Sequence, residues 1–217
     1  MNKAAAALAL LACLCLIGAM MTGEAPAPVP APADDPYDRA AAVAYADAWA
    51  QERNPEYANL ESNCTNYVSQ VLAAGGKRMD EPEPPKPGVR IRYHADGDKW
   101  YCTSIHTQPD RWREFSMSTS FCRTSDFVRY WTERRGMKLT RYDNVYAGMN
   151  RLYMDAEPGD VILLYREDEK TPSHLCVLVE RANRTLLINA NTKDFYRYNL
   201  FDVSPVTYPR LGLLRIR

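Results

Sequence analysis

A cysteine at the start of an expected helix is the feature that most constrains how this chain folds. The segment reads Ser62-Asn63-Cys64-Thr65-Asn66-Tyr67-Val68-Ser69-Gln70. Ser62 and Asn63 are favoured N-cap residues, apolar residues then recur with helical spacing, and Gly75 and Gly76 provide an end. Cys64 is therefore predicted on the first turn, where unpaired N–H groups and the helix dipole favour a thiolate. The alternative is a buried cysteine that acts only as a small apolar residue.

The length and charge of the chain limit the classes of function that it can have. Its 217 residues are enough for one domain with a sizeable core. Lysine plus arginine and aspartate plus glutamate both number 27, so the formal net charge is zero. Nucleic-acid-binding domains usually carry a basic surplus. We therefore expect no nucleic-acid partner.

The first 34 residues have the composition of an export segment and a linker. Residues 1–25 hold an apolar run after Lys3, which is typical of a signal peptide or of a membrane anchor that is kept. The sequence Leu-Ala-Cys at 11–13 also resembles a lipoprotein cleavage box, so a lipid anchor is a further alternative. Residues 26–34 alternate proline with small residues and are predicted to be extended. We expect an extracellular or envelope-associated domain at 35–217, with membrane attachment through the N-terminal segment as one outcome.

The order of the remaining patterns predicts an α+β fold with N-terminal helices packed on an antiparallel sheet. Helices are expected at 36–53, with Asp35 as N-cap, at the Cys64 segment, and from Ser125 to Gly136. Strands are expected at 160–165, 174–180, 186–191 and 213–216. The proline-rich segment 77–123 is expected to be irregular, with its second half packed through Trp100, Tyr101, Trp112 and Phe115.

A hairpin between the second and third expected strands brings two polar residues together. If residues 182–185 form a four-residue loop, Cys176 lies opposite Asn191. His174, at the head of its strand, then shares a face of the sheet with Asn191. A shift of one residue would put Ala190 in that place.

The chain resembles the putative amidase domain family of bacteria, which is grouped with papain-like CHAP and NlpC-type cell-wall hydrolases. The blocks that carry the resemblance are Asn63-Cys64-Thr65-Asn66, the helix from Tyr37, Gly159-Asp160-Val161, Ser173-His174 and Asn191-Thr192-Lys193-Asp194. Members usually have Asp-Cys-Thr-Asn in the first block and Gln-His-Thr in the last. Here Asn63 replaces the acid, and Ala190-Asn191 replaces Gln-His.

The resemblance implies a papain-like fold and a cysteine hydrolase of amide bonds. Cys64 would be the nucleophile and His174 the base that forms an ion pair with it. Asn191 would fix the tautomer of the histidine, as the third member of a Cys-His-Asn triad. The N–H of Cys64, with Asn63 and Asn66, would serve the oxyanion hole or position the site. A peptide or peptidoglycan-type amide is the expected substrate, and the alternative is an inactive papain-like binding module at the cell envelope.

Other histidines and a metal site are the rival interpretations. His94 and His106 are alternative bases, but both lie in the segment expected to be irregular. Zinc is disfavoured because Cys64 and the other cysteines outside the first 34 residues lack paired ligand spacing. No cofactor or metal is expected, and the sequence gives no indication of the oligomeric state.

The two cysteines of the irregular segment are expected to form a disulfide. In an exported chain, a bridge from Cys102 to Cys122 would close a loop of about twenty residues and stabilise the fold by about 3 kcal/mol. The alternative is a pair of buried free thiols.

Overall fold

The computed structural model of the chain describes residues 35–106, 112–143, 145–167 and 169–217. The expected signal or anchor at 1–25 and the linker at 26–34 lie outside these residues. Within the described ranges, no helix is both long enough and apolar enough to cross a membrane.

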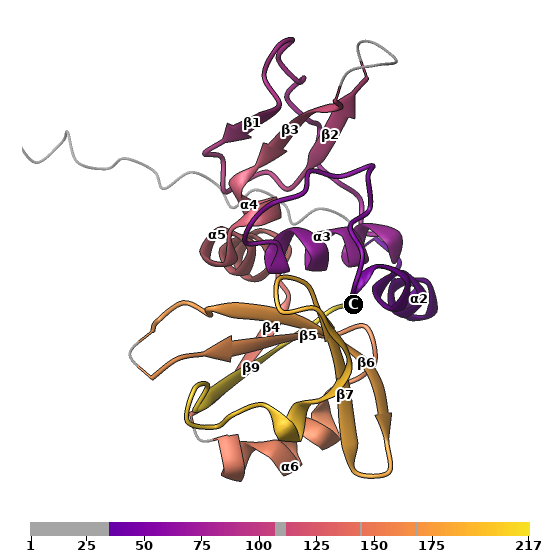
Figure 1. Cartoon of the computed structure of the whole chain (residues 1–217). Coiled ribbons are helices and arrows are strands. Elements are labelled where there is room, and N and C mark those ends of the chain that lie inside the picture. The colour runs from indigo at the N-terminus through magenta and orange to yellow at the C-terminus, as the bar shows by residue number, and fades with distance from the viewer. Residues whose placement is uncertain (1–34, 107–111, 144, 168) are drawn as a thin grey trace, which may run out of the picture. The chain divides into compact units, whose positions relative to one another are not determined.

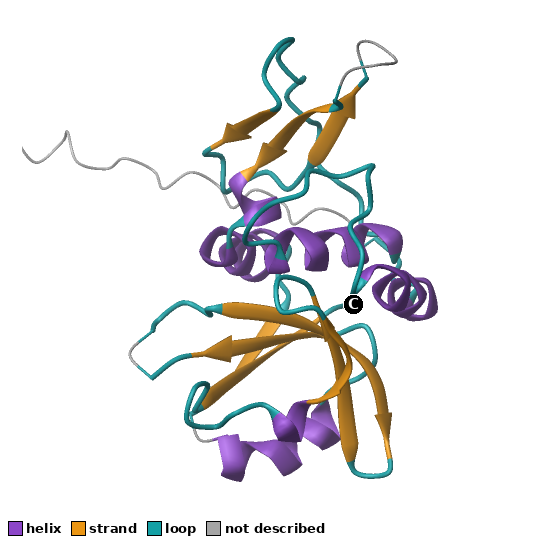
Figure 2. Cartoon of the chain, in the orientation of Figure 1, coloured by secondary structure: helices purple, strands orange, loops and turns teal. Residues whose placement is uncertain are grey.

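Helices come first in the chain and again between strands, as Figure 2 shows by colour. The helical elements are α2 (Arg39–Trp49), α3 (Cys64–Ala74), α4 (Thr119–Cys122), α5 (Thr124–Arg129), the π-helical turn η1 (Tyr130–Arg134), α6 (Val145–Asp155) and the 3-10 turn η2 (Leu200–Asp202). Gly136, with φ of 65°, ends the α5–η1 segment where the sequence predicts a helix end.

The larger sheet has six strands in the order β4-β9-β5-β6-β7-β8, and all its neighbouring pairs are antiparallel. Its strands are β4 (Lys138–Tyr142), β5 (Val161–Tyr165), β6 (His174–Ala182), β7 (Thr185–Ala190), β8 (Phe195–Asn199) and β9 (Arg210–Arg215). The four predicted strands correspond to β5, β6, β7 and β9. The sequence analysis missed β4, β8 and the helix α6.

Two apolar clusters cover the two faces of this sheet. Val161, Leu175 and Val177 pack with residues of α2, α3, α5 and η1. Ile162, Cys176 and their neighbours pack with α6 on the other face. Figure 1 shows α2 and α3 on one side of the sheet and α6 on the other. The predicted α+β class, with N-terminal helices on an antiparallel sheet, is confirmed.

The expectation of an irregular segment at 77–123 is wrong. A three-stranded sheet forms there in the order β1-β3-β2, with β1 parallel to β3 and β2 antiparallel to it. The strands are β1 (Ile91–His94), β2 (Cys102–Ile105) and β3 (Glu114–Ser118). Trp100, Tyr101 and Phe115 are buried as predicted, whereas Trp112 is 56% exposed.

The first helix begins later than predicted because a different aspartate caps it. Asp38 is the N-cap, and its Oδ1 accepts a hydrogen bond of 3.0 Å from the Ala41 N–H. Asp35, the predicted cap, instead pairs with Arg135 over 2.6 Å. Ala42 and Ala46 are fully buried, so this side of the helix packs on the core.

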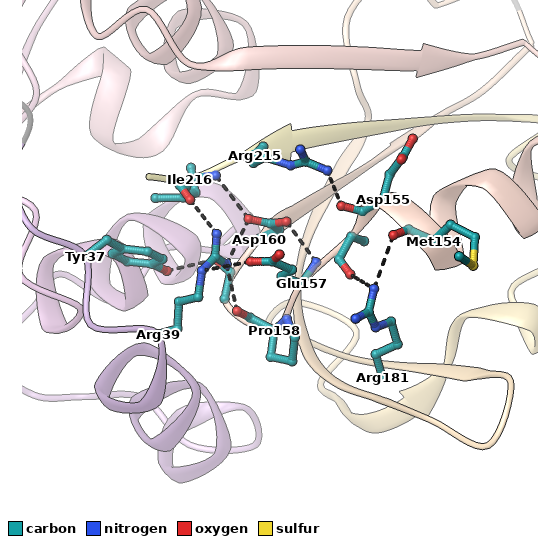
Figure 3. A network of polar contacts seen from close by, with 12 residues as sticks. Tyr37, Arg39, Met154, Asp155, Glu157, Pro158, Asp160, Arg181, Arg215 and Ile216 are labelled. Carbon is teal, nitrogen blue, oxygen red and sulfur yellow. Dashed lines mark hydrogen bonds and ion pairs between the residues drawn. The ribbon is translucent and has the colours of Figure 1, made fainter.

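A buried ion pair joins the first helix to the start of β5 and the end of the chain (Figure 3). Arg39 Nη1 lies 3.0 Å from Asp160 Oδ1, and Arg39 Nη2 donates to the Ile216 carbonyl over 2.6 Å. Asp160 also accepts from the N–H groups of Glu157 and Ile216. Burial raises the pKa of the Asp160 carboxyl, and Arg39 with the two N–H groups opposes that shift. Asp160 and Arg39 therefore hold together α2, the start of β5 and the segment around Ile216.

Candidate active site

Cys64 is the first residue of α3, as predicted. Asn63 occupies the N-cap position, and Gly75 is the C-cap. The Cys64 side chain is 4% exposed, and its Sγ lies 3.9 Å from Thr65 Oγ1. Because the first N–H groups of a helix have no partner within it, the backbone here offers donors beside the thiol. The arrangement suits a nucleophile whose product carries a developing negative charge.

A chain of three side-chain amides runs beside Cys64. Asn66 Nδ2 donates to Asn63 Oδ1 over 2.8 Å, and Asn63 Nδ2 donates to Asn191 Oδ1 over 2.6 Å. Asn191 Nδ2 continues to the carbonyls of Trp49 and Ala50, each at 2.9 Å. Asn63, Asn66 and Asn191 are at most 3% exposed. The chain joins the end of α2, the start of α3 and the end of β7.

These bonds define what the predicted site residues do in the structure. The side chain of Asn63 does not cap α3, because its oxygen accepts from Asn66 and from the Leu60 N–H. Asn66 Nδ2 also donates to the Ala58 carbonyl over 2.7 Å. Both hydrogens of Asn66 Nδ2 are thus used, so an oxyanion could recruit this amide only by displacing a partner, whereas Asn63 Nδ2 keeps a second hydrogen. Both residues are placed to position the start of α3.

Thr192 has a role that the sequence analysis did not assign. Its Oγ1 accepts a hydrogen bond of 2.7 Å from the Asn63 N–H. Thr192 has a φ of 87°, so the backbone turns sharply directly after Asn191. Thr192 belongs to the block Asn191-Thr192-Lys193-Asp194 that carries the resemblance, and this membership could have marked it as a residue of the site.

The predicted register of the β6–β7 hairpin is wrong at the end nearest the site. Leu178 pairs with Ile188 and Val177 with Asn189, because the register shifts between Leu178 and Glu180. Continued along the strands, this register puts Ala190 opposite Cys176. Asn191 therefore lies on the face of α2 and α3, where it donates to the carbonyls of Trp49 and Ala50. His174 alternates with Cys176 and lies on the other face, that of Ile162 and Leu164. The predicted common face of His174 and Asn191 is wrong.

His174 is buried at the head of β6, opposite Leu164. Its Nε2 is buried and has no hydrogen-bond partner among the described residues, and its ring meets the edge of Phe195 at 6.0 Å between centroids. Burial, together with the nearby positive charge of Lys193, lowers the pKa of His174 to about 4. The imidazole is therefore neutral at pH 7.

The structure joins Cys64, Asn63, Asn66 and Asn191 into one group and leaves His174 outside its hydrogen bonds. Among the described residues, no hydrogen bond links His174 to Cys64 or to Asn191, whose Oδ1 is taken by Asn63. Burial raises the pKa of the Cys176 thiol, and the neighbouring Cys64 thiol acts in the same direction.

The expected disulfide is not found, because Cys102 and Cys122 are both free thiols in the structure. The two residues pack against the cluster of Phe115 and Met117 beneath the small sheet. Burial raises the pKa of Cys102 to about 12 and that of Cys122 to about 11. Packing in an apolar cluster accounts for both residues without a bridge.

The rival histidines belong to the small sheet. His94 lies on β1 with Nε2 3.1 Å from Ser116 Oγ, and its ring is 6.1 Å from that of Tyr101. His106 follows β2 and is exposed. Within the described ranges, no group of three or more potential ligands is arranged to hold a metal ion.

A groove of about 390 Å³ lies beside the segment that leads into Cys64. Its walls are Asn59, Leu60, Glu61, Ser62, Ile91, Tyr93, Cys122 and Arg123. Tyr93 is 50% exposed, so the groove offers an aromatic surface with an acid and a base beside it. A groove of this composition can hold an extended polar chain.

Comparison with known proteins gives a family and one similar relative. The family model described as putative amidase domain matches residues 36–208. The uncharacterized protein YhbB of Bacillus subtilis (strain 168) is 30% identical over 164 residues, which are 73% of this chain and 42% of that protein. The chain thus spans less than half the length of this relative. No solved structure matches the chain.

Proposed function

Because the chain belongs to the putative amidase domain family, we propose that it hydrolyses an amide bond with Cys64 as the nucleophile. The observation that carries the proposal is the placement of Cys64 at the first position of α3, beside a buried amide chain that fixes the start of the helix. The family supports an amide-containing substrate in general. The cysteine mechanism is our proposal.

His174 is the proposed base. A neutral imidazole takes the proton of the Cys64 thiol as the sulfur attacks the carbonyl carbon, and the resulting imidazolium gives that proton to the leaving amine. The C–N bond breaks and a thioester forms, which water then hydrolyses with His174 again as base. A pKa of about 4 favours this general-base role over a resting ion pair. Catalytic hydrogen bonds are often absent without substrate, so the unpartnered Nε2 is compatible with the role.

Asn191 has a different proposed role from the one predicted. Its oxygen binds Asn63 and its Nδ2 binds the end of α2, so it holds the start of α3 in place. The Cys64 N–H is the proposed donor to the oxyanion. Asn191 is then a positioning residue that acts through Asn63, and its bond to His174 is not required.

The substrate is proposed to be a peptide of the cell envelope, peptidoglycan peptides included. Residues 1–25 have the composition of an export segment, and the groove lined by residues 59–62, just before Cys64 in the chain, suits an extended polar chain. Export or anchoring through that segment is part of this proposal. A digest of purified peptidoglycan, read by mass spectrometry for a newly released amine, tests it, with Cys64→Ala as the control.

An inactive binding module is the second candidate, favoured by the lack of a hydrogen bond from His174 to Cys64 in the structure. Alkylation with iodoacetamide at pH 7 separates the two. For an enzyme, Cys64 reacts faster than an ordinary exposed thiol, and His174→Ala slows the reaction. His106→Ala, at an exposed position, is the matched control and leaves the rate unchanged. Equal and ordinary rates in all three proteins would support the binding module.

A further inference from the structure

A pocket at one end of the large sheet is not used by the proposed hydrolysis. It has a volume of about 250 Å³ and is lined by Arg141, Asp143, Tyr165, Lys170, Arg210 and Leu211. These residues come from β4, β5, β9 and the segments that follow β4 and β5. Three of the six carry a positive charge and one, Asp143, carries a negative charge. We name it the basic pocket.

Tyr165 supplies an unsatisfied polar group to the basic pocket. The residue is only 3% exposed, yet its hydroxyl is buried and has no hydrogen-bond partner among the described residues. The guanidinium carbons of Arg141 and Arg210 each lie 5.9 Å from the centre of its ring. Burial raises the pKa of this hydroxyl, and the neighbouring Arg141 opposes that shift. Since buried hydroxyls are nearly always hydrogen-bonded, Tyr165 and Arg141 together offer donors to a group bound in the pocket.

Arg210 is held in place through one of its terminal nitrogens, and its Nε is left without a partner among the described residues. Its Nη2 donates to three carbonyls of the segment after β5, those of Arg166, Glu167 and Glu169, over 2.6 to 2.7 Å. Its Nε is buried and has no partner among the described residues. Glu169 Oε2 is also buried without a partner, but Glu169 does not line the pocket. Backbone carbonyls thus hold the Arg210 guanidinium in place without cancelling its positive charge.

We propose that the basic pocket binds an oxyanion, the phosphate or carboxylate group of a small ligand. Arginine and lysine side chains are the usual partners of both groups, and the Tyr165 hydroxyl supplies a neutral donor. The pocket lies at the end of β5, where the neighbouring residue Leu164 pairs with His174. Anion binding in this pocket can be measured without any amidase activity, so the proposal does not rest on the proposed function.

Titration of the 15N-labelled protein with inorganic phosphate, and separately with acetate, tests the proposal by amide chemical shifts. We expect saturable shifts at the residues of the basic pocket with at least one anion. Lys170→Ala and Tyr165→Phe should each weaken that binding by about tenfold or more, since each removes one partner of a charged group. Lys170 is exposed and the phenylalanine keeps the ring, so both variants should retain the spectrum of the fold.

Lys86→Ala is the matched control, because Lys86 is an exposed lysine away from the pocket. Binding of phosphate alone would identify a phosphorylated ligand, and binding of acetate alone would identify a carboxylate. Unchanged shifts with both anions would overturn the proposal. The same loss of affinity in Lys86→Ala as in Lys170→Ala would also overturn it, because it would show attraction to the general charge of the protein.

Discussion

Asn63 Nδ2 donates a hydrogen bond of 2.6 Å to Asn191 Oδ1, across 128 residues of chain and beside Cys64. The two positions where the resemblance led us to expect an acid and a histidine therefore hold a bonded pair of asparagines. Two amides form a neutral hydrogen bond, so no charge is buried at this contact.

This pair should show strong coupling in a double-mutant cycle. Asn63→Ala leaves Asn191 Oδ1 buried and unpaired, and Asn191→Ala leaves Asn63 Nδ2 in the same state, so each should cost about 1 to 3 kcal/mol of the free energy of unfolding. The double variant should cost less than the sum by about 1 kcal/mol. Urea unfolding of the four proteins measures the coupling, and strict additivity would mean that the bond contributes nothing.

Stability should depend on pH through His174. The pKa of this histidine falls from 6.5 to about 4 on folding, so between these values the unfolded chain binds a proton that the folded chain does not. Folding is therefore weakened as pH falls through this window, by about 3 kcal/mol in total, and the full stability is present above pH 6.5. Urea unfolding between pH 4 and 7 checks the slope. His174→Gln should remove that slope, whereas His106→Gln should keep it.

Loss of Arg39 should be far more damaging than loss of an arginine whose carboxylate partner is exposed to solvent. Arg39→Ala leaves Asp160, whose side chain is fully buried, without its cation, which typically costs about 3 to 5 kcal/mol. Arg53→Ala breaks the 2.8 Å pair with Asp194, which is 45% exposed, and should cost about 1 kcal/mol or less. Thermal unfolding of both variants gives the comparison. Similar losses in the two would show that the buried pair is not a structural centre.

The two thiols of the small sheet should react far more slowly in the native protein than in the unfolded chain. With pKa values of about 12 and 11, Cys102 and Cys122 hold almost no thiolate at pH 8. Alkylation of the native protein at pH 8, followed by peptide mapping, should label both only slowly, and 8 M urea should speed the labelling of both. Rapid labelling of Cys122 in the native state would contradict the packing beneath the small sheet.

The sequence was sufficient where local signals determine structure. Asn63, Cys64 and Gly75 mark the start and end of α3, and the apolar runs from Val161 and His174 identify β5 and β6. These signals involve residues that are close in the chain, so they can be recognised from the sequence alone.

The parts that the sequence did not reveal depend on distant contacts. β1 finds its parallel partner β3 only after a long excursion, and both strands are short. The shift of register beside Val179 adds one residue to β6, which no composition signal marks. The bond from Asn63 to Asn191 depends on that shift. The sequence therefore identified residues of the candidate site, but not the hydrogen bonds between them.

The position of β9 sets a temporal order on the maturation of this domain. β9 comes last in sequence among the described strands, yet it lies between β4 and β5 in the interior of the sheet. Until residues 210–215 leave the ribosome, β4 has no neighbour in the sheet and one edge of β5 is open. The large sheet can therefore close only after those residues have been made, so two strand edges stay unpaired through most of the translation of this domain.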